Sequence, residues 1–382
     1  MPSGAGSVRP DVSIVSSGHD VADARLHREA AALQRAGLTV EVLALGTATD
    51  GPPAGRIRTW SRTSLLSRAG LALSLPWRAR GGVVIALDPD SAVGAWLRRA
   101  AGRALPGLRT VRIVADVHED YRLLLQDRQW ARGARRLAGT AWARLGEFAA
   151  RRADVTVVAD LHLLPGIPGR VVFRNVPDLA MLPDPFPADD TPRALYVGDL
   201  RRSRGLFAML DALAIADGWL LDLVGPVRPA DVPELQRRLD AEPDLARRVR
   251  LHGRQPPREA WRLARGAWAG LLLLEDTPAF VESVPSKVYE YLACGLPVLS
   301  TRLPRVATVL AETGAGVVID DAEAAGAALV GWSEQPQTLR ELRRSALEAG
   351  KRFVDESGEF VAACLRLTAR PDGTRKRPAR SA

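Results

Sequence analysis

Short apolar runs recur along the chain, separated by longer segments whose apolar positions have helical spacing. In the first half these runs read VSIVSS, TVEVLAL, GVVIALD, TVRIVAD, DVTVVAD and RVVFRN. Continuous apolar strands that alternate with helices are typical of a parallel sheet covered on both faces. After the first run, the pattern predicts a helix over residues 23–37 that ends on glycine. The first half is therefore predicted to be a doubly wound α/β domain.

The same alternation restarts in the second half with RALYVGDL, WLLDLVGP, RVRLHGR, GLLLLED, LPVLST and AGVVID, so a second doubly wound domain is predicted. Proline is frequent between the halves, where it cannot continue a helix or a central strand. Two such domains facing each other would bind ligands at the carboxyl ends of their strands. The predicted divisions are an N-terminal domain over 1–176, a linker over 177–192, a C-terminal domain over 193–345, a C-terminal helix over 346–368 that could return to the N-terminal domain, and a basic disordered tail over 369–382.

The composition is that of a soluble globular protein, with 47% hydrophobic and 25% charged residues. No apolar run approaches the ~20 residues of a membrane-spanning helix, and the first residues lack the apolar core of a secretion signal. We therefore expect a cytosolic protein. Cys294 and Cys364 are expected to be reduced core thiols, and five histidines without a Cys/His cluster argue against a bound metal centre.

The net charge of +9 comes almost entirely from arginine. This bias is typical of a GC-rich genome, or it marks a surface for an acidic partner. Residues 128–152 mix arginines with Trp130, Trp142 and leucines, as do basic helices that lie on anionic membranes; residues 58–80 carry the same mixture. The alternative is a solvated arginine face over a core stripe. Nucleic acid is not an expected partner, because no nucleic-acid-binding motif accompanies the charge.

A candidate anion site lies in the segment ESVPSKVYEYLACGLPVLST, residues 282–301. A helix is predicted to begin at Pro285 or Ser286, where proline is well accommodated, and to end at Gly295. The free N–H groups and the positive dipole end at a helix start favour an anion, and Lys287 adds a full charge beside them. A diphosphate would suit this place.

Two carboxylates flank the candidate anion site. Glu290 lies one turn into the predicted helix, where it can accept hydrogen bonds from hydroxyls such as those of a ribose. Glu282, in the preceding loop, can reach a second polar group. Two glutamates at this spacing are common, and the alternative is an ordinary strand, loop and helix with solvated glutamates.

The same segment resembles the donor-site signature of the GT-B glycosyltransferases, in particular the retaining family 4 group: a glutamate, seven residues, a second glutamate and a Gly-x-Pro-Val strand. Three other segments are similar to that group in the matching order: GHDVADARLHREAAALQRAGLTVEVLALG, VADVHEDY and YVGDLRRSRGLFAMLDAL. Two positions depart from its pattern. His19 follows Ser17 and Gly18 where many members have a Gly-Gly pair, and Asp199 stands where arginine is frequent.

The resemblance implies a GT-B fold of two Rossmann-like domains. It implies a retaining, metal-independent glycosyltransferase that moves a sugar from a nucleotide-diphosphate sugar to an acceptor hydroxyl without a cofactor, the donor phosphate leaving on the side from which the acceptor attacks. UDP is favoured as the nucleotide, and the acceptor is undetermined. The alternatives are a non-catalytic nucleotide-sugar-binding subunit and an epimerase or hydrolase of the donor. A peripheral position at the inner face of the membrane would agree with the basic aromatic segments.

The resemblance also implies roles for particular residues. The catalytic candidates are His118 and Glu282, the latter as a hydroxyl-binding group for the donor sugar. Asp116 and Glu119 could orient His118 or cap the following helix, and Ser286 could be a helix cap, a phosphate ligand or both. The predicted donor-binding residues are Arg201, Arg204, Ser286, Lys287 and Glu290, and the further candidates for the cleft are His19, Asp23, Arg25, Asp116 and Glu119.

Overall fold

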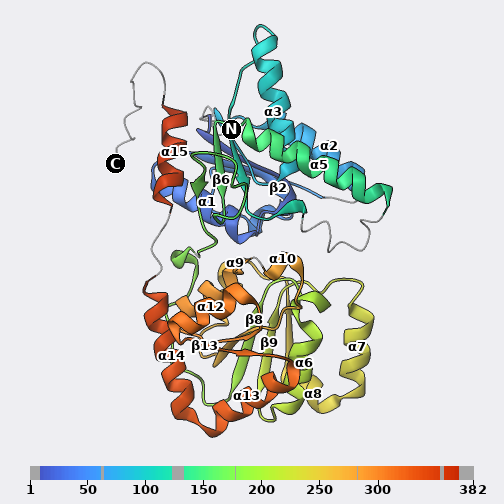
Figure 1. The fold of residues 1–382 in the computed structure, drawn as a ribbon, viewed down its shortest axis with the longest axis vertical. Helices are drawn as coiled ribbons and strands as arrows, with labels where there is room; N and C mark the ends of the chain where they lie inside the picture. Colours follow the sequence, from blue (N-terminus) through green and yellow to red (C-terminus); the bar gives the residue numbers. More distant parts are fainter. Residues whose placement is uncertain are drawn as a thin grey trace, which may run out of the picture. The chain divides into compact units, whose positions relative to one another are not determined.

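The computed structural model describes residues 9–61, 64–122, 133–176, 178–281, 283–352 and 357–369 of the chain. The chain divides into two compact units (Figure 1). Unit 1 comprises residues 1–174 and 356–382, and unit 2 comprises residues 175–355. Each unit contains one parallel sheet with helices on both faces, so the predicted pair of doubly wound α/β domains is confirmed.

Unit 1 is built on a seven-stranded sheet in the order β3-β2-β1-β4-β5-β6-β7, and every neighbouring pair is parallel. The six predicted apolar runs supply all strands except β3, whose sequence RIRTW alternates arginine with other residues and is half-buried at the sheet edge. Because it lacks a continuous apolar run, the sequence pattern did not predict it. The strands are β1 (Val12–Asp20), β2 (Val40–Leu45), β3 (Arg56–Trp60), β4 (Val83–Ala86), β5 (Arg112–Val117), β6 (Val155–Val158) and β7 (Val171–Val172).

Helices cover both faces of this sheet. One face packs against α1 and α15, and the other packs against the layer of α2, α3 and α5 (Figure 1). The expected helix over residues 23–37 is α1, whose cap residues are Asp23 and Ala36. The helices of unit 1 are α1 (Ala24–Arg35), α2 (Leu65–Arg78), α3 (Pro89–Ala104), α5 (Ala134–Arg151) and α15 (Gly358–Thr368), with a short 3-10 turn η1 (Ala48–Asp50).

The C-terminal part of the chain departs from the expected single helix over residues 346–368. The first residues of that range end α14 in unit 2, and a separate helix, α15, begins at Gly358. The helix α15 packs on α1 and β7 of unit 1, where Phe360 is fully buried and stacks on Phe173 with ring centroids 5.0 Å apart and planes 4° apart. The expected basic tail lies outside the described residues beyond residue 369.

Unit 2 contains a six-stranded parallel sheet in the order β10-β9-β8-β11-β12-β13. The strands are β8 (Arg193–Val197), β9 (Leu220–Val224), β10 (Val249–Gly253), β11 (Ala269–Leu272), β12 (Val298–Thr301) and β13 (Gly316–Ile319). The helices are α6 (Leu206–Ile215), α7 (Val232–Ala241), α8 (Pro243–Arg248), α9 (Pro257–Arg262), α10 (Pro278–Val281), α11 (Ser286–Ala293), α12 (Pro304–Thr313), α13 (Ala322–Glu334) and α14 (Pro336–Gly350), with 3-10 turns η2 (Leu179–Met181) and η3 (Arg202–Arg204).

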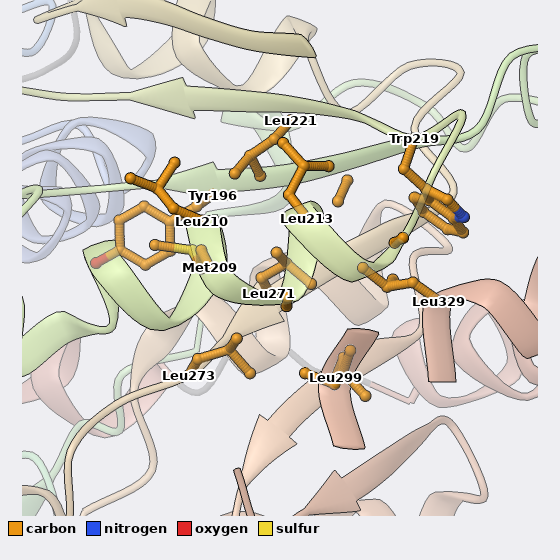
Figure 2. Close-up of a cluster of buried hydrophobic side chains, with 14 of the residues drawn as sticks. Tyr196, Met209, Leu210, Leu213, Trp219, Leu221, Leu271, Leu273, Leu299 and Leu329 are labelled. Atoms are coloured by element: carbon orange, nitrogen blue, oxygen red, sulfur yellow. The ribbon is translucent and has the colours of Figure 1, made fainter. Parts of the chain in front are cut away.

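The core of unit 2 has two parts, one on each face of the sheet. Figure 2 shows the first, in which Tyr196 and Trp219 lie among leucines from β9, β11, β12, α6 and α13. The second is packed by α9, α11, α12 and α14. Cys294 lies in this second part and Cys364 in unit 1, and both are buried and free, as the sequence predicts.

The proline-rich segment between the halves lies against unit 2. Arg258 donates to the carbonyl of Ala180 at 3.0 Å, and Arg343 donates to that of Phe186 at 2.6 Å. The indole of Trp268 donates to the carbonyl of Asp189 at 2.7 Å. The described part of the expected linker is therefore held by side chains of unit 2.

Candidate functional site

Two glycines at the strand ends of unit 2 lie where no larger residue fits, Gly198 at the end of β8 and Gly205 just before α6. Gly205 has a φ of +79°, and a Cβ there would lie 2.0 Å from the carbonyl oxygen of Leu273. At the end of β8, a Cβ on Gly198 would lie 2.7 Å from Nζ of Lys287. Glycine therefore brings the backbone after β8 directly against the lysine of α11.

Lys287 is the second residue of α11, and its ammonium lies 5.5 Å from the centroid of the Tyr196 ring. Burial and the positive charge of Arg204 lower the pKa of Lys287 to about 8, although Glu290 and Asp199 partly oppose them. No carboxylate in the described part of the chain lies within 4.0 Å of its Nζ. Lys287 is thus a half-buried cation without a protein counterion among the described residues.

Two arginines of the loop after β8 lie close enough to Lys287 for their positive charges to affect it. The charges of Arg204 and Arg201 both reach Lys287, and Nη1 of Arg204 lies 3.8 Å from Oδ2 of Asp199. Arg202 is engaged elsewhere, because it forms an ion pair with Glu234 and stacks over a phenylalanine. The predicted donor-binding cations are therefore close together, whereas the neighbouring arginine is not part of the group.

The start of α11 is close to the predicted position. Pro285 occupies the cap position, and no side chain caps the first amides of the helix. Ser286 is the first helical residue, and its hydroxyl donates to Oε2 of Glu290 at 3.3 Å, so the expectation that Ser286 caps the helix is wrong. Glu290 is buried, one turn into the helix, as expected. Glu282 lies outside the described residues.

In unit 1, Asp88 organises the last residues of β1, where the pairing with β2 shifts register. It accepts hydrogen bonds from the Ser16 hydroxyl at 2.7 Å, the Ser17 amide at 2.8 Å and the Gly18 amide at 3.2 Å, and it caps α3 through the amide of Ser91. Burial raises the pKa of Asp88, but nearby positive charges and these hydrogen bonds lower it below its ordinary value. Asp88 was not among the site residues expected from the sequence. The signal was an aspartate directly after a strand and before a proline, which is typical of a helix start.

His19 lies at the carboxyl end of β1 and forms an ion pair with Asp23, the residue that caps α1. Its Nδ1 lies 3.1 Å from Oδ2 of Asp23, whose other oxygen accepts from the amide of Arg25 and so caps the helix. Burial lowers the pKa of His19, but the Asp23 hydrogen bond and the charges of Asp23, Asp88 and Glu119 outweigh it and raise the pKa to about 9. Asp23 is therefore both a helix cap and the counterion of a charged histidine.

The residues after β5 divide into a buried and an accessible part. The ring of His118 lies edge-on against that of His19, with centroids 4.8 Å apart, and its Nδ1 lies 3.3 Å from Oδ2 of Asp116. Glu119 is exposed. Asp116 does not cap a helix; it is buried and binds both Nε and Nη2 of Arg25. Arg25, expected at the cleft, is itself buried against that carboxylate.

Comparison with known proteins agrees with this architecture. Residues 182–352 match the family model described as Glycosyl transferases group 1. Sucrose-phosphate synthase from Thermosynechococcus elongatus has a similar structure, with a TM-score of 0.69 and 17% identity over 94% of this chain and 97% of that protein. Anabaena HepE, solved with UDP and glucose, has a TM-score of 0.67 and 16% identity over 94% of this chain and 99% of that protein.

WaaG, a glycosyltransferase involved in lipopolysaccharide biosynthesis, superposes with a TM-score of 0.62 and 16% identity over 93% of this chain and 99% of that protein. No curated protein matches the chain in a sequence search. The two Rossmann-like units therefore have the fold of the GT-B glycosyltransferases, as the resemblance implied.

The ion pair of His19 predicts a particular dependence of stability on pH. Because the pKa of His19 is about 9 in the folded protein and 6.5 for an ordinary histidine, its stabilising charge is complete below pH 6.5 and is lost as pH rises through 9. We expect the unfolding temperature of the wild-type protein to fall more steeply over this interval than that of His19→Gln. Calorimetry of both proteins from pH 6 to 10 measures this; parallel curves would contradict the charge assignment.

Proposed function

We propose that this protein is a glycosyltransferase that moves a sugar from a nucleotide-diphosphate sugar to an acceptor hydroxyl. The observation that carries the proposal is Lys287, a cation without a described counterion, beside Arg204 and the uncapped start of α11. This cluster lies within the part of the chain that matches Glycosyl transferases group 1. A diphosphate would supply the missing negative charge.

The proposed chemistry assigns most of the work to electrostatics. Lys287, Arg204 and the amides at the start of α11 stabilise the charge that grows on the leaving diphosphate. Glu290 accepts hydrogen bonds from the ribose, and Arg201 adds to the positive field. His118 is assigned to the sugar or the acceptor, since it follows β5 at the carboxyl end of the unit 1 sheet.

The proposal extends to the nucleotide, the stereochemical outcome and the metal requirement. The nucleotide is proposed to be UDP, as in the HepE structures solved with UDP and with UDP-glucose. Retention of the anomeric configuration follows from the resemblance to the retaining group. Transfer is proposed to be independent of a metal ion, because the cations of this chain can neutralise the leaving group themselves.

A donor assay tests the proposal directly. Purified protein is incubated with UDP-, GDP-, ADP- and dTDP-sugars, with and without a panel of hydroxyl acceptors, and released nucleotide is measured. A transferase releases nucleotide mainly when an acceptor is present. Release from the donor alone would instead indicate a hydrolase, conversion of the sugar without release an epimerase, and binding without turnover a non-catalytic subunit.

Lys287→Ala should weaken binding of UDP by ~1.5 to 3 kcal/mol, because a charge-assisted hydrogen bond to the diphosphate is lost. Isothermal titration calorimetry with bare UDP measures the change. Lys351→Ala is the matched control, since Lys351 is an exposed lysine of the same unit. Equal affinity in the two variants would remove Lys287 from the proposed site.

We also propose that the outer face of α5 and its neighbouring helices contacts an anionic membrane surface. On α5, Leu137, Leu145 and Phe148 are 75%, 37% and 37% exposed and share one helical face with Ala141. Arg136 and Arg144 are exposed beside them. An exposed apolar stripe flanked by cations suits the boundary between lipid headgroups and acyl chains.

The inner face of α5 is fixed by different residues. The indole of Trp142 donates to Asp90 of α3, which also binds Arg68 of α2. On the outer face of α2, Trp77 is 44% exposed. The layer of α2, α3 and α5 thus presents several apolar side chains outward, while polar contacts hold the helices together. No helix in the described part of the chain is long and apolar enough to cross a membrane.

Wild-type protein should sediment with vesicles that contain phosphatidylserine and should be released at 1 M salt, where the screening length is about 3 Å. Arg136→Glu with Arg144→Glu should weaken sedimentation, because two attractive charges become repulsive. Arg340→Glu with Arg344→Glu on α14 is the control, since both arginines are exposed there as well. Absence of vesicle binding by the wild-type protein at low salt would refute the membrane surface.

A further inference from the structure

Arg25 is the centre of a buried polar cluster in unit 1. Its Nε and Nη2 donate to the two oxygens of Asp116, the second at 2.6 Å, so the guanidinium and the carboxylate form a fork. Arg25 is 3% exposed and Asp116 is 2% exposed. This buried Arg25–Asp116 pair has a fixed geometry, because a planar guanidinium that binds both carboxylate oxygens fixes the orientation of the carboxylate.

Asp116 is the counterion that balances this buried guanidinium. Glu29 lies next to both groups and is also fully buried. Burial and the charge of Asp116 hold the pKa of Glu29 well above its usual range, and the positive charges of Arg25 and Arg28 offset this only in part. Burial and the neighbouring Asp116 therefore disfavour a charge on Glu29, and Asp116 is the carboxylate that forms the fork with Arg25.

The third arm of Arg25 reaches the segment where the chain leaves unit 1. Its Nη1 donates to the carbonyl of Phe173 at 2.9 Å, and the guanidinium lies 5.3 Å from the Phe173 ring centroid. The Phe173 ring also stacks on Phe360 of α15, the helix that follows the return of the chain to unit 1. One side chain thus binds both the strand end that carries Asp116 and the exit segment.

Asp116 also contacts the candidate catalytic histidine. Its Oδ2, which accepts from Nε of Arg25, lies 3.3 Å from Nδ1 of His118. The fork therefore determines where that oxygen is relative to the imidazole. A shift of Asp116 would move a carboxylate oxygen that contacts the imidazole, so we expect the position of the ring to change with it.

We propose that Arg25 is a positioning residue for His118, acting through Asp116 and anchored on the carbonyl of Phe173. Its effect on turnover rests on the proposed function, whereas its effect on the position of His118 does not. A misplacement of about 1 Å near the reacting groups can cost about 100-fold in rate, so a side chain that never touches substrate can control turnover.

Arg25→Lys tests this role, since lysine keeps the charge but cannot form the fork. Arg28→Lys is the matched control: Arg28 lies on the same helix, contacts the same Phe173 ring at 5.7 Å and donates to the carbonyl of Arg174 at 3.2 Å. The readout is the Hε1–Cε1 NMR signal of His118, assigned by its absence in His118→Gln. It should shift in Arg25→Lys and stay in place in Arg28→Lys.

Turnover and nucleotide binding supply the second readout. Turnover of the donor should fall about 10- to 100-fold in Arg25→Lys, while the affinity for UDP stays within about twofold, because the proposed nucleotide site lies in unit 2. If the wild-type protein turns over no donor, the proposed function fails, and the NMR signals still decide the positioning role.

A folded Arg25→Lys protein whose His118 signal is unchanged would overturn the proposal. Should Arg25→Lys fail to fold, the reciprocal experiment decides. In His118→Gln, the Nε–Hε signal of Arg25 should shift because Asp116 loses its contact with the imidazole and readjusts. An Arg25 signal identical to that of the wild-type protein would also overturn the proposal.

Discussion

Both sheets of this protein are parallel and are covered by helices on their two faces, and this constraint decides where chemistry can occur. Backbone polar groups within the sheets are paired, and the faces are filled by the apolar residues of the core. Polar side chains inside the strands, such as Glu41 of β2 and Asp222 of β9, are buried and bonded within the protein. The strand ends are where polar groups can meet a ligand, and the cations after β8, the start of α11, His19 at the end of β1 and His118 after β5 all lie at such ends.

The charged groups of this protein are treated in two ways. Several are neutralised within the protein: Arg25 by Asp116 and His19 by Asp23 in unit 1, and Arg193 by Asp222 in unit 2. In unit 2, Lys287 lies beside other cations and has no described carboxylate partner. Its pKa is lowered because burial and the neighbouring positive charges disfavour the charged ammonium. Unpaired charge in a partly buried place is costly unless something neutralises it. A preformed cationic site therefore favours an anionic ligand, whereas the neutralised pairs of unit 1 favour a fixed geometry.

The helix α5 has an inner and an outer side. Its inner residues pack on α3, with Trp142 bound to Asp90, and its outer side includes Leu137, which is 75% exposed, and Leu145 and Phe148, which are each 37% exposed. An ordinary solvated helix would have polar residues on that outer face. The outer side of α5 therefore exposes apolar side chains as well as arginines.

The sequence by itself determined the local features of this protein. Apolar runs predicted every strand except β3, and Pro285 and Gly295 predicted the two ends of α11 to within a residue or two, because these signals depend on neighbours only a few positions apart. An anion site at Lys287 was expected from the helix start beside it, which is a local signal. Arg204 was expected only from the resemblance to the family.

Only the tertiary structure decided the partners of these side chains. Arg25 was a candidate for the cleft, but it is buried against Asp116, 91 positions away. Asp88 binds the amide of Gly18 in the last part of β1, 70 positions earlier in the chain. The division of the C-terminal part into α14 and α15 and the bond from the Ser286 hydroxyl to Glu290 also differ from expectation. Local pattern specifies helices and strands, but a long polar side chain can satisfy its hydrogen bonds with many alternative partners. Packing in three dimensions selects among them.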